Sequence, residues 1–269
     1  MRSNNPVFKN GPFARGGAAG YQGTSAYDLE SMYAAPAAGP VRTGRMTLDD
    51  VIMKTAAMFA VLLVAAAGAW YLTPAVPFLP FVGMIGGLVL GLVISFKQST
   101  NPAMHLGYAV LEGLFVGGVS RFYQGYAQAG GGDTNIVGQA VLGTLAAFAV
   151  MLVLNRTGVL KATPRFVRMM TIALGAYLII ALASFVAALF GVGSGWGFYG
   201  VGGLGLLLCV AGVALAAFSL VLDFDFIEHS VRAGVPQRYS WLAAFGLVVT
   251  LVWLYLELLR LLAILQGRD

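Results

Sequence analysis

Seven long apolar stretches, each of about twenty residues, make up more than half of this sequence of 269 residues. They lie at roughly 51–73, 78–96, 103–126, 136–155, 166–190, 200–222 and 240–263. A helix of about twenty apolar residues crosses the hydrocarbon core of a bilayer, and it bonds its backbone N–H and C=O groups internally. The sequence therefore predicts an all-α polytopic membrane protein in which seven transmembrane helices form a compact bundle.

The composition agrees with this class and argues against several others. Only 10% of the residues are charged and 59% are hydrophobic, whereas ordinary soluble domains carry about 25% charged residues. The basic residues that produce the net charge of +5 are scattered over short connections, so we expect no nucleic-acid partner. The one cysteine, Cys209, excludes a disulfide framework within the chain. Because the motifs HExxH, GxSxG and the Walker loop are absent, we expect no enzyme, no cofactor and no metal site.

Residues 1–46 differ from the rest of the chain. They are rich in Gly, Ala, Pro, Ser and Asn and show no apolar period, so they are predicted to form a disordered cytoplasmic tail. Thr47 and Asp50 fit a capping box, which predicts that the seven-helix domain, 47–269, begins there with a helix. The first apolar stretch is too long for a signal-peptide core, so we expect it to remain as an anchor.

The distribution of basic residues predicts the orientation of the chain. With the N-terminus in the cytoplasm, thirteen of the sixteen Lys and Arg residues lie on the cytoplasmic side. Only Arg121, Arg260 and Arg268 lie on the other side, which is a clear positive-inside bias. We therefore expect an integral protein of the plasma (inner) membrane. The charges at Glu257 and Arg260 leave open whether the last stretch spans fully, and hence the side of the C-terminus.

Small residues recur at a spacing of four in two of the stretches. Gly83, Gly87 and Gly91 share one face of the second stretch, and Gly113 and Gly117 share one face of the third. This spacing is typical of membrane helices whose backbones approach closely. It predicts a compact bundle and carries no information about a substrate.

Glu112 is an acidic residue in the middle of the third apolar stretch. The nearest cation in sequence, Arg121, is nine residues further on, which is about 13 Å along a helix. An isolated charge in hydrocarbon is costly, so Glu112 must face the bundle interior and either hold a proton or meet a cation. A purely structural role, as a protonated acid bonded to a neighbouring helix, is the alternative.

Two more acids follow the sixth apolar stretch. Asp223 and Asp225 are two residues apart, about 200° around a helix, so they cannot share a face. Asp223 is the deeper residue and is predicted to point inward, whereas Asp225 points toward the headgroups. Asp225, Glu228 and His229 are spaced by three and four residues, which indicates a solvated face.

The last apolar stretch carries a charged pair. Glu257 and Arg260 are at positions i and i+3 on one helix face, so each can neutralise the other. This pair can be structural only. Alternatively, Glu257 reaches the same interior as Asp223, and Arg260 tunes its charge.

Four segments of this sequence resemble a known family. Val51–Thr55 resembles the start of the first span of the Bax-inhibitor family, also called the transmembrane Bax inhibitor motif family. Leu111–Leu114 resembles the third span of that family, and Leu222–Asp223 and Leu254–Arg260 resemble its last two spans. The order and spacing of these segments are similar to those of a bacterial-type member over about 50–269.

The resemblance implies seven helices with a central last helix and a pH-sensitive calcium leak. In this family, two aspartates on the last two spans share a proton and gate the pore. Asp223 matches the first aspartate, but the place of the second falls near Thr250, which cannot ionise. If Asp223 has a partner, Glu257 or Glu112 must supply the second carboxylate.

The leading hypothesis is therefore a pH-sensitive leak for calcium or another cation. Its pathway residues would be Asp223, Glu112 and Glu257, with a weak transit site for Ca²⁺ at Asp223. Asp225, Arg260 and Arg121 would be secondary residues of this pathway. A proton-coupled transporter of a small solute would use the same acids as relay groups, and a non-conducting regulator would bind other membrane proteins through the glycine faces or the tail. The expected partners are thus the lipid bilayer, calcium or protons, and unidentified membrane proteins.

Overall fold

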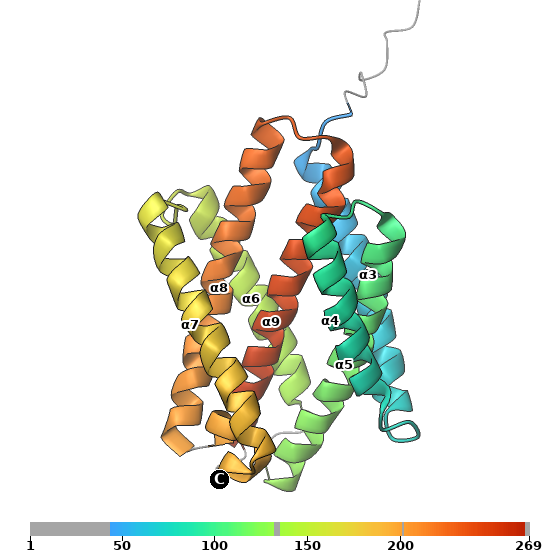
Figure 1. Ribbon diagram of the computed structural model, residues 1–269, viewed down its shortest axis with the longest axis vertical. Helices are drawn as coiled ribbons and strands as arrows, with labels where there is room; N and C mark the ends of the chain where they lie inside the picture. Colours follow the sequence, from blue (N-terminus) through green and yellow to red (C-terminus); the bar gives the residue numbers. More distant parts are fainter. Residues whose placement is uncertain (1–43, 132–134, 201, 267–269) are drawn as a thin grey trace, which may run out of the picture. The chain divides into compact units, whose positions relative to one another are not determined.

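The computed structural model describes residues 44–131, 135–200 and 202–266. Most of the predicted tail, residues 1–43, lies outside the described residues. The helices of the described part are α3 (Leu48–Leu72), α4 (Leu79–Lys97), α5 (Pro102–Ala129), α6 (Ile136–Arg156), α7 (Pro164–Leu189), α8 (Gly202–Arg232) and α9 (Ser240–Gln266), drawn in Figure 1. Short 3₁₀ turns follow α7, named η1 (Val192–Gly195) and η2 (Gly197–Gly200), and η3 (Gln237–Tyr239) precedes α9.

Within the described ranges, seven helices are long and apolar enough to cross a membrane. This confirms the prediction of an all-α bundle with seven spans. The last helix, α9, is continuous over 27 residues, so its internal charges do not shorten it. Length and composition therefore let α9 cross the membrane like the other six helices.

Helix α9 occupies the middle of the bundle, as Figure 1 shows. It packs against α3, α5, α6 and α8, and it has the largest buried share of the seven candidate spans. Val248, Leu254 and Leu259 on this helix have no exposed surface. In contrast, α7 is the least buried span and packs mainly on α8 and the η1–η2 segment. The expected central last helix is thus present.

The start of α3 is the predicted capping box. The Thr47 hydroxyl oxygen accepts from the Asp50 backbone N–H at 3.1 Å, and Asp50 Oδ2 accepts from the Thr47 N–H at 3.1 Å. The connection between α8 and α9 is tied to this start by backbone bonds, since the Met46 N–H donates to the Val235 carbonyl at 2.7 Å. The Gln237 side chain also donates to Asp50 Oδ1, at 2.6 Å. One end of α3 is therefore fixed to the turn before α9.

Helix α8 extends beyond the sixth apolar stretch. The apolar stretch ends at Leu222, but the helix continues for ten more residues, through Arg232. This segment contains no Gly or Pro, and two pairs at i and i+4 support the helix: Asp225 with His229 at 3.3 Å, and Glu228 with Arg232 at 2.6 Å. Charged residues mark where a helix leaves hydrocarbon, and not where the helix itself ends.

The glycine faces are sites of close helix approach, as their spacing predicts. Gly83 of α4 lies against the α5 backbone at Leu111, and Gly113 and Gly117 of α5 lie against α3. A Cβ atom placed on Gly117 would be 2.8 Å from the Cα atom of Ala66, closer than any relaxed contact. These glycines let α5 pack between α3 and α4.

Replacing Gly117 should therefore destabilise the bundle. Gly117→Ala is expected to cost about 1–3 kcal/mol, because the added methyl group overlaps the backbone of Ala66. Gly125→Ala is the matched control, since Gly125 is on the same helix with nothing within 4 Å of its Cβ position. It should be neutral or stabilise by up to about 1 kcal/mol. The measurement is the melting temperature in detergent, and equal values for the two variants would contradict the close approach.

Candidate functional site

Asp223 lies at the contact between α8 and the central helix α9. Its carboxyl group is beside the side chain of Thr250, and its Oδ2 atom is buried without a hydrogen-bond partner in the described part of the chain. Thr250 donates its hydroxyl to the Gly246 carbonyl at 3.2 Å, as a threonine in a helix interior commonly does. The structure thus places a single carboxylate at this contact, with a hydroxyl group opposite it.

Asp225 faces the other way. Its side chain is 35% exposed and lies 3.3 Å from His229 Nδ1, and Glu228 pairs with Arg232 beside it. Exposed pairs of this kind contribute only about 0.3–0.5 kcal/mol each. The geometry is that of the solvated face which the sequence indicates.

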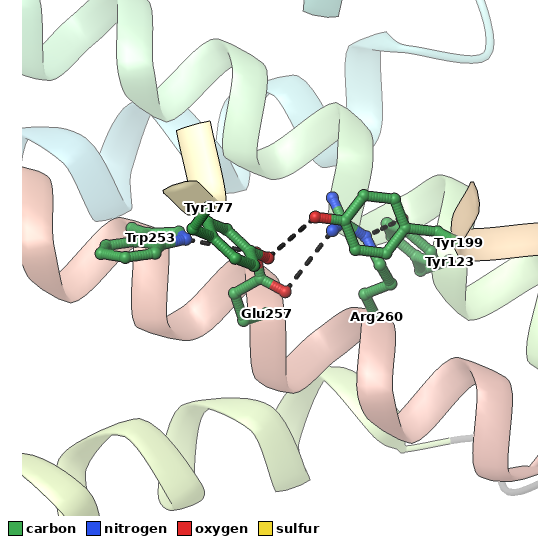
Figure 2. Close-up of polar contacts among 6 residues, drawn as sticks. All are labelled: Tyr123, Tyr177, Tyr199, Trp253, Glu257 and Arg260. Atoms are coloured by element: carbon green, nitrogen blue, oxygen red, sulfur yellow. Dashed lines mark hydrogen bonds and ion pairs between the residues drawn. The ribbon is translucent and has the colours of Figure 1, made fainter. Parts of the chain in front are cut away.

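Glu257 lies deep in the bundle on α9, and its side chain is only 5% exposed. Its Oε1 atom accepts from the Tyr177 hydroxyl at 2.7 Å and from Trp253 Nε1 at 3.2 Å. Its Oε2 atom lies 3.4 Å from Arg260 Nη1, which is long for an ion pair. Figure 2 shows Tyr177 and Trp253 directed at this carboxylate from one side and Arg260 from the other.

Arg260 is enclosed by aromatic rings. Its guanidinium group lies 4.3 Å from the centre of the Tyr199 ring, and its Nε atom donates to the Tyr123 hydroxyl at 3.3 Å. The Tyr199 hydroxyl donates to Tyr177 at 2.8 Å, which links the arginine side of the cluster to the carboxylate side (Figure 2). Burial raises the pKa of the Tyr199 phenol, so it remains a neutral donor at ordinary pH.

A cavity of about 530 Å³ opens beside this cluster. We call it the α7–α9 cavity, because it lies between the second half of α7, the η1–η2 segment and the C-terminal half of α9. Its polar wall holds Tyr123, Tyr177, Tyr199, Glu257 and Arg260. The rest of its lining is apolar or aromatic, with Ser184 as the exception.

The three interior carboxylates do not come together. Glu257 is seven residues from Thr250 on α9, about 10 Å along the axis, so it does not supply a partner for Asp223. Glu112 lies at the contact of α4 and α5, beside Tyr108. A Cβ on Gly87 would be 3.0 Å from its Oε2 atom.

The remaining candidate, Arg121, is not part of any of these sites. Its guanidinium group lies 5.7 Å from the centre of the Trp70 ring on α3. Within the described residues, no three His, Cys, Asp or Glu side chains lie together as a metal centre requires.

Comparison with known proteins identifies the family. A family model described as Bax inhibitor 1 like matches residues 5–267. The chain belongs to the Bax inhibitor 1-like family. No curated protein matched it. The family and the seven apolar helices together make the chain an integral membrane protein.

Asp223 and Thr250 face one another across the contact between α8 and α9. Thr250 stands where the resemblance places the second aspartate, and in the structure it does face Asp223. At this contact the structure therefore has one carboxyl group and one hydroxyl group.

The tyrosines around Glu257 were not found from the sequence. Trp253 could have been, because it is four residues before Glu257 and so shares its helix face. Tyr123, Tyr177 and Tyr199 come from three other segments, and only the fold brings them to α9.

Removing one hydroxyl group tests the cluster. Tyr177→Phe should lower stability by about 1–3 kcal/mol, because it takes the closest donor from a buried carboxylate. Tyr71→Phe is the matched control, since the Tyr71 ring is 79% exposed. Melting temperatures of the two variants in detergent are compared. If Tyr177→Phe melts with the native chain, the hydrogen bond to Glu257 contributes nothing to stability.

Proposed function

We propose that this chain is a pH-sensitive leak for calcium or another cation, and that Asp223 is its titrating group. The observation that carries the proposal is the buried, unpartnered Oδ2 atom of Asp223 against the central helix. The family membership supports it as well. We further propose that the protein lies in the plasma membrane with its N-terminus in the cytoplasm, on the strength of the positive-inside bias. The proposal involves neither catalysis nor a cofactor.

The physics of a lone buried carboxyl group explains how such a leak would respond to pH. An unpaired carboxylate in a medium of low dielectric constant is costly, so the closed contact favours the protonated form. Loss of the proton creates a charge that water or a cation must compensate, and this favours opening between α8 and α9. Calcium prefers several oxygen ligands, and one carboxylate with a hydroxyl and backbone carbonyl groups would hold it only weakly. Weak binding lets the calcium ion leave the site again, as a leak requires.

A flux assay with one substitution tests the role of Asp223. Purified protein in liposomes with a trapped calcium indicator should conduct more as the pH rises from 5 to 8. Asp223→Asn should remove this dependence, because the amide cannot ionise. Since one group titrates, the native flux should change by at most about tenfold per pH unit.

Asp225→Asn is the control, because it makes the same chemical change at a solvated position two residues away. It should keep the native pH profile. A native profile for Asp223→Asn, or no flux at any pH from folded protein, would refute the proposal. A proton flux that requires an added solute would indicate a transporter instead.

Thr250→Asp tests the missing partner. This substitution places a second carboxylate opposite Asp223, and two carboxylates in a dry contact cannot both be charged. We expect the midpoint of the flux profile to move to higher pH by about one unit or more. Thr250→Asn is the uncharged control and should leave the midpoint in place. An unchanged midpoint in Thr250→Asp would mean that position 250 does not face Asp223 in the working protein.

A further inference from the structure

The guanidinium group of Arg260 has more hydrogen-bonding capacity than the protein uses. It carries five N–H donors, but within the described residues it makes two bonds to oxygen, at 3.3 and 3.4 Å, and a weak sulfur contact with Cys209. Charge-assisted bonds are ordinarily about 2.7–2.9 Å long. The side chain is 27% exposed and lines the α7–α9 cavity. A partly buried arginine whose donors are not all used by the described residues, at a cavity wall, is suited to a bidentate anion such as a carboxylate or phosphate.

The remainder of the cavity suits an apolar body. Its volume of about 530 Å³ falls within the range of small-molecule sites, about 300–1,000 Å³. Leu174, Leu178, Phe185 and Trp196 line it away from the charged pair. An inorganic anion would leave these walls unfilled. An organic cation would meet Arg260 and find Glu257 already accepting from Tyr177 and Trp253.

We propose that the α7–α9 cavity binds an amphiphilic organic anion through Arg260, and that Glu257 takes up one proton as the anion binds. The anion would be a carboxylate or phosphate ester with an aryl or alkyl group in the apolar part. This site is distinct from Asp223, and its existence does not depend on the leak.

The proton follows from the charge balance of the site. Glu257 and Arg260 together are neutral. Among the described residues, the other titratable groups facing Glu257 are Tyr177 from α7, Tyr199 from η2 and Cys209 from α8. A bound anion would leave one net negative charge beside the mainly apolar lining of the cavity, which is unfavourable. Protonation of Glu257 restores neutrality, so one anion and one proton enter together. Binding should therefore tighten as the pH falls.

Two sources can supply this chemistry. A lipid headgroup can enter sideways, because the cavity is walled by α7, the least buried span. A free amphiphile in solution carries the same anionic group and apolar chain. The recognition chemistry is common to both, and the experiment below separates them.

The test is calorimetric titration of 4-phenylbutyrate into the full-length protein in phosphatidylcholine nanodiscs. The probe stays ionised between pH 6 and pH 8, so any pH dependence belongs to the protein. We expect binding at both values, tighter at pH 6 by up to about 100-fold, since one linked proton changes affinity by at most tenfold per pH unit. The neutral analogue 4-phenylbutanol should bind much more weakly. No binding by folded protein, or equal binding of the alcohol, would overturn the proposal.

Two substitutions assign the roles. Glu257→Gln should bind the probe tightly at both pH values, because the repelling charge and the proton uptake are both removed. Arg260→Gln should abolish binding, whereas Arg121→Gln, an equal charge change at a residue outside the cavity, should not. If Arg260→Gln does not fold, Glu257→Gln still tests the proposal. If probe binding by Glu257→Gln keeps the native pH dependence, proton uptake at Glu257 is disproved.

Phosphatidylglycerol distinguishes the sources. If an anionic lipid occupies the cavity, adding phosphatidylglycerol to the nanodiscs should weaken apparent binding of the probe in the native chain. If the occupant is a free anion, the affinity should not change. The probe titrations decide whether Arg260 binds an anion, and the lipid comparison decides which source supplies it.

Discussion

The burial of α9 among other helices is the constraint on which the polar chemistry of this protein depends. A charged or hydroxyl side chain is costly against lipid, but it can be satisfied where protein surrounds it. Thr250, Glu257 and Arg260 all lie on α9, and each meets a side chain from another segment. The close approach of α5 to its neighbours at Gly113 and Gly117 keeps the bundle compact enough for this enclosure. The polar sites are thus a consequence of a central helix.

The interior carboxylates differ in how they are compensated, and this separates their expected behaviour. Glu257 has two hydrogen-bond donors and an arginine, so its charge is stabilised within the protein. Asp223 has a buried oxygen atom without a hydrogen bond in the described residues. A compensated charge suits a fixed binding site, whereas an uncompensated one makes the stability of its contact depend on protonation. The two acids therefore suit different tasks, although both lie at the contact between α8 and α9.

Much of the fold followed from the sequence, because about twenty apolar residues have few alternatives to a membrane span. The capping box at Thr47 and the pair of Glu257 with Arg260 were also predictable, since both are local spacings. The length of α8 was not, because the apolar stretch ends at Leu222 and hydropathy does not show how far the helix continues beyond it. The tyrosines around Arg260 could not be predicted, since Tyr123 precedes it by 137 residues and only tertiary packing joins them.

Thr250 and Glu257 are related by their positions on α9. Seven residues turn an α-helix by nearly two full rotations, so these side chains share one face of α9, two turns apart. Both positions face α8, where Thr250 meets Asp223 and Glu257 meets Gly212. A Cβ on Gly212 would lie 2.7 Å from the carboxyl carbon of Glu257, so only glycine leaves room there. The α8–α9 contact therefore holds an acid from α8 at one level and an acid from α9 at the other, and the distance between them prevents the two from sharing a proton.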